Sequence, residues 1–249
     1  PSFHNPAGVT QGPARRTEIL EIARREGILL LEDDPYGLLG FDGSVPRAIR
    51  ADEADGVIYL GTFSKTIAAG LRVGWALAPH GVREKLVLAN ETATLCPSQY
   101  TQLTVSEYLA TQPWLDQVKV FRELYRERRD ALLESLDALM PAGTNWTVPA
   151  GGFYSWVTLP EGLDATAMLP RAVAALVAYV PGVGFYADGQ GHDHMRLSFC
   201  YPTPSAIEEG VRRLSTVVQS ELEVVQMFGV KDRVSAHRKG INIPAPDTF

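Results

Sequence analysis

Cysteine is scarce in this sequence, which contains only Cys96 and Cys200. The two residues form no C-x-x-C pair, so a disulfide framework and a structural zinc site are both disfavoured. We therefore expect no metal site. A reducing, cytoplasmic compartment suits a chain with so few thiols.

Long apolar runs and a surplus of positive charge are also missing. No apolar stretch reaches the ~18 residues that a membrane-spanning helix needs, so we expect no membrane association. The net charge is -6, which disfavours a general nucleic-acid surface, because binding the phosphate backbone requires clustered Lys and Arg. Any phosphate bound here must be held by a few local donors.

The sequence begins at Pro1 without a methionine and runs at once into the turn Asn5-Pro6-Ala7-Gly8. Proline fixes φ, glycine permits positive φ and asparagine bonds locally, which is the chemistry of a turn. We expect that an upstream portion precedes this turn, and a signal peptide is left open.

The remaining pattern predicts an α/β protein. A helix is expected from Thr10 or Gln11 to Glu26, with Gly27 as its stop. Short apolar runs typical of buried parallel strands follow at 28–31, 57–60 and 73–77. Two of these runs end in polar segments, 32–36 and 61–65. Because open α/β sheets bind ligands beyond the carboxyl ends of their strands, we expect the site there.

Past Pro79 the pattern is helical to about Met140, with interruptions near Pro97 and Pro113. The later part mixes strands and helices, including a half-buried strand at 195–199 and a helix at 204–218. We predict a mostly parallel large domain over 1–110, a smaller α+β domain over 111–220 and an extended tail over 221–249.

Lys65 lies at the end of a predicted strand. The hydroxyl residues Thr62 and Ser64 precede it, and Arg72 follows seven residues later. A single loop lysine is usually solvated, but these neighbours favour a chemical role. Lysine amines form Schiff bases with carbonyl cofactors. The Arg72 guanidinium matches a phosphate, and the two hydroxyls add neutral donors.

The segment from Thr62 to Gly74 resembles the lysine motif of the fold-type I PLP-dependent aminotransferases, class I/II, S/T-x-S-K-x-x-x-P-G-L-R-x-G. Every marked position matches except Ala69, where proline is usual. The resemblance extends to about residue 218 and is greatest to the 2-aminoadipate aminotransferase and MocR-like subgroup. It implies a fold-type I large domain, incomplete over these residues, followed by a smaller α+β domain.

The resemblance implies further cofactor contacts. Asp33 looks like the carboxylate that pairs with the pyridine nitrogen of pyridoxal 5'-phosphate (PLP), which keeps the ring protonated and electron-withdrawing. Tyr36 and Asn5 resemble the residues that donate to the phenolic oxygen. Asp34 is the rival carboxylate, but the three-residue spacing to Tyr36 favours Asp33. Asp34 and Glu32 are expected to be structural or solvated.

Arg196 matches the arginine that grips the substrate α-carboxylate as a bidentate pair, with Asn5 also on the substrate side. The segment 151–156 resembles the family's glycine-rich strand and is expected to be scaffold. His192 and His194 lack a metal-like partner set and are expected in a solvated loop.

We therefore predict a PLP-dependent aminotransferase, with an amino acid and a 2-oxo acid as substrates. Lys65 is expected to form a Schiff base with PLP and then to act as general base and acid. The resemblance also implies a homodimer. Two family features upstream of the Asn5 turn, a Gly/Ser phosphate loop and an aromatic stacked on the ring, have no candidate in 1–249. We therefore expect this chain alone to hold PLP poorly.

Two alternatives remain. One is a MocR-type transcription regulator, in which an aminotransferase-like domain senses PLP behind an N-terminal winged helix. Nucleic acid is an expected partner only in that case. The other is a β-lyase or decarboxylating relative with the same lysine. The pocket residues alone do not separate these functions.

Overall fold

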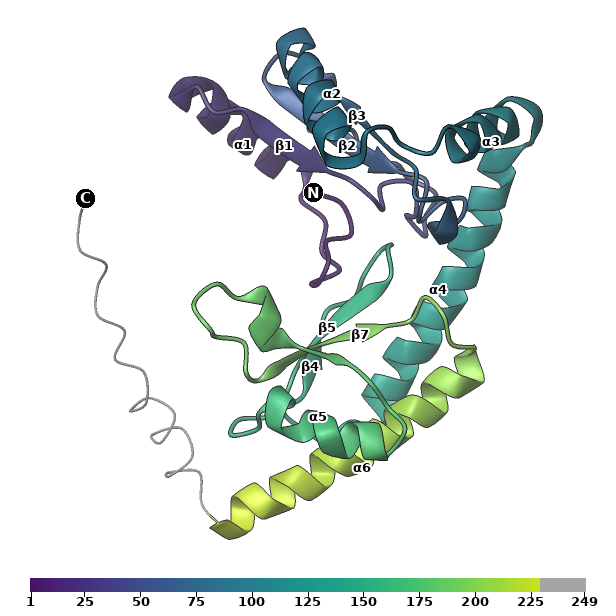
Figure 1. Ribbon diagram of the computed structural model, residues 1–249. Coiled ribbons are helices and arrows are strands. Elements are labelled where there is room, and N and C mark those ends of the chain that lie inside the picture. Colours follow the sequence, from purple (N-terminus) through teal and green to yellow (C-terminus); the bar gives the residue numbers. More distant parts are fainter. Residues whose placement is uncertain (229–249) are drawn as a thin grey trace. The chain divides into compact units, whose positions relative to one another are not determined.

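The structure is a computed structural model and describes residues 1–228 (Figure 1). The predicted tail beyond residue 228, with Pro244 and Pro246, lies outside the described residues. Contacts divide the chain into two compact units. The first comprises Pro1–Ala131, Thr147–Ser155 and Ser198–Pro204, and the second comprises Leu132–Trp146, Trp156–Leu197 and the residues from 205 onward. The first unit thus continues beyond residue 110, where the sequence placed a domain boundary.

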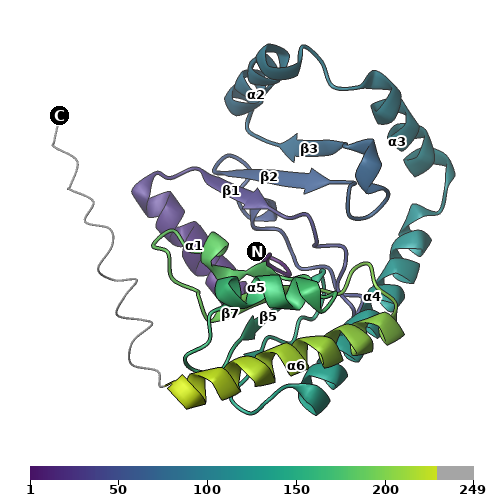
Figure 2. The same cartoon turned by 60° about the horizontal axis from the view of Figure 1, so that its bottom comes forward.

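The first unit contains a three-stranded sheet with helices before and after it. Its elements are α1 (Pro13–Glu26), β1 (Leu30–Asp33), β2 (Val57–Thr62), β3 (Gly74–Leu77), α2 (His80–Thr94), α3 (Gln99–Thr111) and the first part of α4 (Trp114–Leu139), with 3-10 turns η1 (Ile49–Ala51) and η2 (Ala69–Leu71). The strands lie in the order β1-β2-β3 (Figure 2). β1 runs parallel to β2, whereas β3 runs antiparallel to β2. The residues of β3 are all exposed, so the prediction of a buried parallel strand at 73–77 was wrong. The parallel pair brings the ends of β1 and β2 to the same edge of the sheet.

The predicted helix of the first unit is confirmed, together with its stop. Pro13 occupies the first turn of α1, where its missing N–H costs nothing. Gly27 adopts φ 64°, and its N–H bonds to the carbonyls of Ala23 and Arg24. This left-handed cap is the conformation for which glycine is favoured.

The parallel pairing of β1 was predicted correctly, but its burial on both faces was wrong. Leu31 is 65% exposed and Leu29 is 48% exposed, whereas Glu32 is 3% exposed. Neighbouring strand residues face opposite sides of a sheet, and only one side of β1 is covered within the described residues. Glu32 is buried because its carboxylate accepts from the backbone N–H groups of Ile49 (2.9 Å) and Arg50 (3.0 Å).

The core that supports the site joins residues far apart in the chain. It contains the buried side chains of Phe3, Tyr36, Leu39, Val118 and Phe153. The backbone reaches Phe3 closely at Gly151, where an added Cβ would lie 2.6 Å from the Phe3 ring. Glycine at this position therefore permits the contact, which brings Phe153 into the same core as Tyr36.

The second unit is built around a four-stranded sheet and two helices. Its elements are the end of α4, β4 (Asn145–Trp146), β5 (Tyr154–Thr158), α5 (Ala165–Ala174), β6 (Val180–Pro181), η3 (Gly182–Phe185), β7 (His194–Ser198) and α6 (Pro204–Phe228). The strand order is β4-β5-β7-β6. The first residues of β5 and the last residue of β7 are counted with the first unit. The predicted α+β character of this part of the chain agrees with these elements.

Helix α6 continues to Phe228 instead of ending near Val218. Glu221 is buried on α6 and forms an ion pair with Arg171 of α5, and the two helices lie side by side (Figures 1 and 2). This pairing continues the packed face of α6 past the point where its apolar periodicity fades.

None of the described helices combines the length and apolarity of a membrane span.

Candidate cofactor site

Three of the predicted site residues line one cavity in the first unit. The cavity has a volume of about 420 Å³, and Asn5, Asp33 and Tyr36 all face it. Asp33 is the last residue of β1, Tyr36 follows in the next turn, and Asn5 comes from the turn after Phe3. The cavity therefore offers a carboxylate, a phenol and a side-chain amide.

Asp34, the rival carboxylate, lies on the other side of the strand end. It lines a different cavity of about 660 Å³ and is 8% exposed. The Tyr59 hydroxyl donates to Asp34 Oδ2 at 2.8 Å. Burial, and secondly the Asp34 carboxylate, raise the pKa of the Tyr59 phenol well above its ordinary value. Because strand side chains alternate, Asp33 faces Asn5 and Tyr36 while Asp34 does not.

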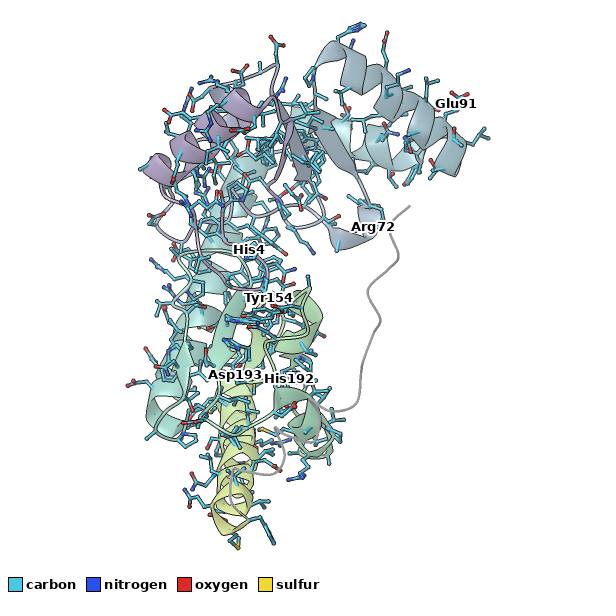
Figure 3. The ribbon with its side chains drawn as sticks, turned by 90° about the vertical axis from the view of Figure 1, so that its left-hand side faces the viewer. His4, Arg72, Glu91, Tyr154, His192 and Asp193 are labelled. Atoms are coloured by element: carbon cyan, nitrogen blue, oxygen red, sulfur yellow. The ribbon has the colours of Figure 1, made fainter. Side chains whose placement is uncertain are left out.

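The loop after β2 gathers two hydroxyls and a guanidinium. Thr62 Oγ1 donates to the carbonyl of Val73 at 3.2 Å and accepts from the Ser64 N–H at 3.1 Å. Arg72 Nη1 donates to Ser64 Oγ at 3.0 Å. Arg72 directly follows η2, has a left-handed backbone at φ 53°, and its side chain is exposed (Figure 3). The loop thus places a permanent cation beside a hydroxyl, as a phosphate site requires.

Lys65 lies next to an aromatic residue that the sequence had assigned to scaffold. Lys65 Nζ is 5.9 Å from the centroid of the Phe153 ring. That ring meets the Tyr36 ring edge-on, with centroids 5.3 Å apart, and meets Tyr125 at 4.8 Å. Lys65 and Tyr36 are therefore both neighbours of Phe153. No local pattern signalled this contact, since 88 residues separate Lys65 from Phe153 along the chain.

Arg196 lies on β7 in the second unit. It is on the strand face opposite Met195 and Leu197, which are both buried. Its guanidinium carbon is 5.2 Å from the centroid of the Phe185 ring. His194, expected in a solvated loop, instead begins β7 and stacks on Trp156 at 5.5 Å. His192 does lie in the loop and is exposed.

In the part of the chain that the structure describes, no cluster of His, Cys, Asp or Glu gathers as metal ligands would. The first unit presents a lysine, a carboxylate, hydroxyls and a guanidinium in the segments that follow two parallel strands. Sites of this kind belong to enzymes that hold an organic phosphate cofactor on a lysine.

The chain belongs to the aminotransferase class I and II family, whose sequence profile matches residues 1–214. It has the α/β fold of the PLP-dependent transferases of fold type I. The recognition made from the lysine motif is confirmed.

Several relatives show how much of the family's length this chain spans. It is 43% identical to aromatic-amino-acid aminotransferase 1 of Thermococcus litoralis, covering 90% of this chain and 54% of that protein. The fold is similar to the structure of LysN, the α-aminoadipate aminotransferase of Thermus thermophilus, complexed with N-(5'-phosphopyridoxyl)-L-leucine. The TM-score is 0.87 and the sequence identity is 36%, and the match covers 90% of this chain and 59% of the LysN chain.

The chain is also 33% identical to the uncharacterized HTH-type transcriptional regulator YisV of Bacillus subtilis, covering 85% of this chain and 44% of that protein. The chain therefore spans about half the length of the relatives it matches.

The cofactor of this family is PLP, and the residues present fit it. A carboxylate, an amide and a phenol share one cavity, matching a pyridine nitrogen and a phenolic oxygen. The hydroxyl and guanidinium of Ser64 and Arg72 match a phosphate. The amine of Lys65, on the same loop as Ser64, matches the aldehyde.

Proposed function

We propose that this protein is a PLP-dependent aminotransferase that moves an amino group between an amino acid and a 2-oxo acid. The observation that carries this proposal is the shared cavity of Asn5, Asp33 and Tyr36, beside the aromatic contact of Lys65. PLP, when bound, supplies an aldehyde that amines attack and a ring that withdraws electrons from the substrate.

In the first unit, one group is proposed to transfer a proton, and others are proposed to hold a proton in place or to donate hydrogen bonds. The Lys65 amine would hold the aldehyde group of the cofactor and, when free, would take a proton from the substrate Cα and return it to the former aldehyde carbon. The Asp33 carboxylate keeps a proton on the ring nitrogen, because an opposite charge favours the protonated form. The Tyr36 hydroxyl and the Asn5 amide donate to the phenolic oxygen.

Binding and orientation fall to other residues. Arg72, Ser64 and Thr62 are proposed to bind the phosphate with charge-assisted hydrogen bonds. Arg196 is proposed to bind the α-carboxylate of the substrate, with Asn5 contributing on the substrate side.

The organisation around these residues is also proposed. We propose a cytoplasmic location and a homodimeric assembly.

An amino-donor screen with 2-oxoglutarate as acceptor tests the proposed activity. The screen uses the full-length protein and a Lys65→Ala variant. Lys85→Ala is the matched control, because Lys85 is an exposed lysine on α2. We expect turnover in the wild type and in the control and none in Lys65→Ala. Borohydride reduction followed by peptide mass spectrometry is expected to find the cofactor adduct on Lys65. Turnover that survives in Lys65→Ala would remove this residue from the mechanism.

The similarity to an HTH-type regulator supports a second candidate, a PLP-sensing transcription regulator of the MocR type. The pocket is the same in both candidates. Absence of turnover with every donor, together with specific DNA binding by the full-length protein, would favour the regulator. The higher identity to a named aminotransferase supports the enzyme.

A further inference from the structure

Arg196 is held against a group of aromatic side chains that the proposed mechanism does not use. Its guanidinium carbon lies 5.2 Å from the Phe185 ring centroid. The Phe185 ring meets Trp156 edge-on, with centroids 5.4 Å apart and an interplanar angle of 87°. Trp156 in turn stacks on His194 at 5.5 Å and 27°. All four residues belong to the second unit.

The backbone explains why Phe185 reaches Arg196. β6 pairs antiparallel with β7 and places Val180 opposite Arg196. η3 follows directly, and at Gly182 an added Cβ would lie 2.6 Å from His194 Cβ and 2.5 Å from the carbonyl oxygen of Gly191. Only glycine permits this close approach. The turn therefore folds back over β7 and carries Phe185 onto the guanidinium.

Trp156 contacts the Phe185 ring and is itself packed against His194. Trp156 lies on β5 and is buried, with 9% of its surface exposed. The His194 ring stacks on Trp156, and His194 Nδ1 lies 2.6 Å from Oδ1 of the preceding residue, Asp193. Phe185 itself is 36% exposed. The Phe185 ring thus contacts both Trp156 of β5 and Arg196 of β7.

We propose that Phe185 is the positioning residue for Arg196, holding the guanidinium plane in place before a carboxylate arrives. This inference rests on the proposed function, in which Arg196 binds the substrate α-carboxylate. A bidentate pair needs the planar fork aligned with the two carboxylate oxygens. A free arginine side chain loses conformational freedom when it binds, and an arginine already held against a ring loses less.

The effect belongs to binding and not to the chemical step. The substrate carboxylate stays bound to Arg196 in the ground state and in the transition state. Loss of the Phe185 contact is therefore expected to raise KM and leave kcat nearly unchanged. Cation–π contacts of this kind correspond to about a 5-fold change in an equilibrium constant.

Kinetics provide one test. In Phe185→Leu we expect KM for an amino-acid donor to rise about 5-fold, with kcat unchanged, and Phe185→Tyr to restore the wild-type KM. The amide of the same amino acid lacks the carboxylate, so its KM should not respond to Phe185→Leu. Tyr186→Leu is the matched control, because Tyr186 is the next residue after Phe185 and its ring also contacts Trp156 and His194. An equal rise in the control, or with the amide donor, would overturn the proposal.

A second measurement needs no activity. In a ¹H–¹⁵N spectrum of the protein, the Arg196 Nε–H signal is assigned by its loss in Arg196→Lys. The Phe185 ring current is expected to shift this signal, and the shift should vanish in Phe185→Leu and persist in Phe185→Tyr. An unchanged signal in Phe185→Leu overturns the proposal even if transamination occurs. If the Arg196 Nε–H shift disappears in Phe185→Leu but the protein shows no turnover, the positioning contact is supported and only the proposed function is refuted. Phe185→Met replaces the leucine variant if that variant fails to fold.

Discussion

Replacing Tyr59 with phenylalanine removes a single hydroxyl at a buried charge. This hydroxyl donates to Asp34 Oδ2 at 2.8 Å, and Asp34 is 8% exposed. The other carboxylate oxygen, Oδ1, has no hydrogen-bond partner within residues 1–228. The Tyr59 ring stacks on Trp75 with centroids 5.3 Å apart, and phenylalanine keeps this contact. The substitution therefore isolates the hydrogen bond to the carboxylate.

The size of the effect follows from the charge of the acceptor. Hydrogen bonds to charged groups contribute about 1.5–3 kcal/mol, and a carboxylate left without its donor retains the cost of desolvation. Tyr59 is only partly buried, so water replaces some of the loss. We expect the free energy of unfolding to fall by about 2 kcal/mol, which is roughly a 30-fold change in the folding equilibrium.

Urea denaturation at pH 7, followed by far-ultraviolet circular dichroism, measures this loss. Tyr179→Phe is the matched control, because the Tyr179 hydroxyl donates at 2.6 Å to the neutral carbonyl of Ala165, and we expect it to cost about 1 kcal/mol. In an Asp34→Asn background, the cost of Tyr59→Phe should also fall to about 1 kcal/mol. An equal cost in both backgrounds would refute the reasoning from charge.

Three further predictions concern packing and protonation. An added Cβ at Gly61 would lie 2.3 Å from the Trp75 ring, so Gly61→Ala is expected to cost about 1–3 kcal/mol of unfolding free energy and to redshift Trp75 fluorescence; unchanged emission and stability would contradict this. Burial raises the pKa of the Tyr59 and Tyr179 phenols above their ordinary value of 10.0, so the stability that they contribute is complete below pH 10 and is lost as the pH rises further. Absorbance at 295 nm should show these two phenols ionising only as the protein unfolds, and full ionisation of the folded protein near pH 10 would show the idea wrong. Hydrogen bonds from two arginines on the same helix lower the pKa of Glu209 to about 2; a ¹³C titration should place its midpoint there at low salt and nearer 4.5 at high salt, and a low-salt midpoint near 4.5 would count against the ion pairs.

Short-range features of this protein were predictable from its sequence. The glycine stop of α1, the helix breaks near Pro97 and Pro113, and the alternating strand around Arg196 each depend on a few neighbouring residues. The lysine motif was recognisable for the same reason, since Thr62, Ser64, Lys65 and Arg72 lie in one loop. Local backbone preferences decide such features before any distant contact forms.

Contacts between distant segments required the tertiary structure. The apolar run of β1 does not reveal which face is covered, and Leu31 is exposed on the face that the sequence treated as buried. Likewise, the end of α6 depends on Arg171 of another helix, which meets Glu221 beyond the fading apolar pattern.

The same limit applies to the site. The close approach at Gly151 brings Phe153 beside Lys65, and the turn at Gly182 brings Phe185 onto Arg196. Residue types and spacing identified the two cationic groups, but the rings beside them come from segments whose proximity depends on how the whole chain packs. Side-chain identity is a local property, whereas the surroundings of a side chain are created by folding.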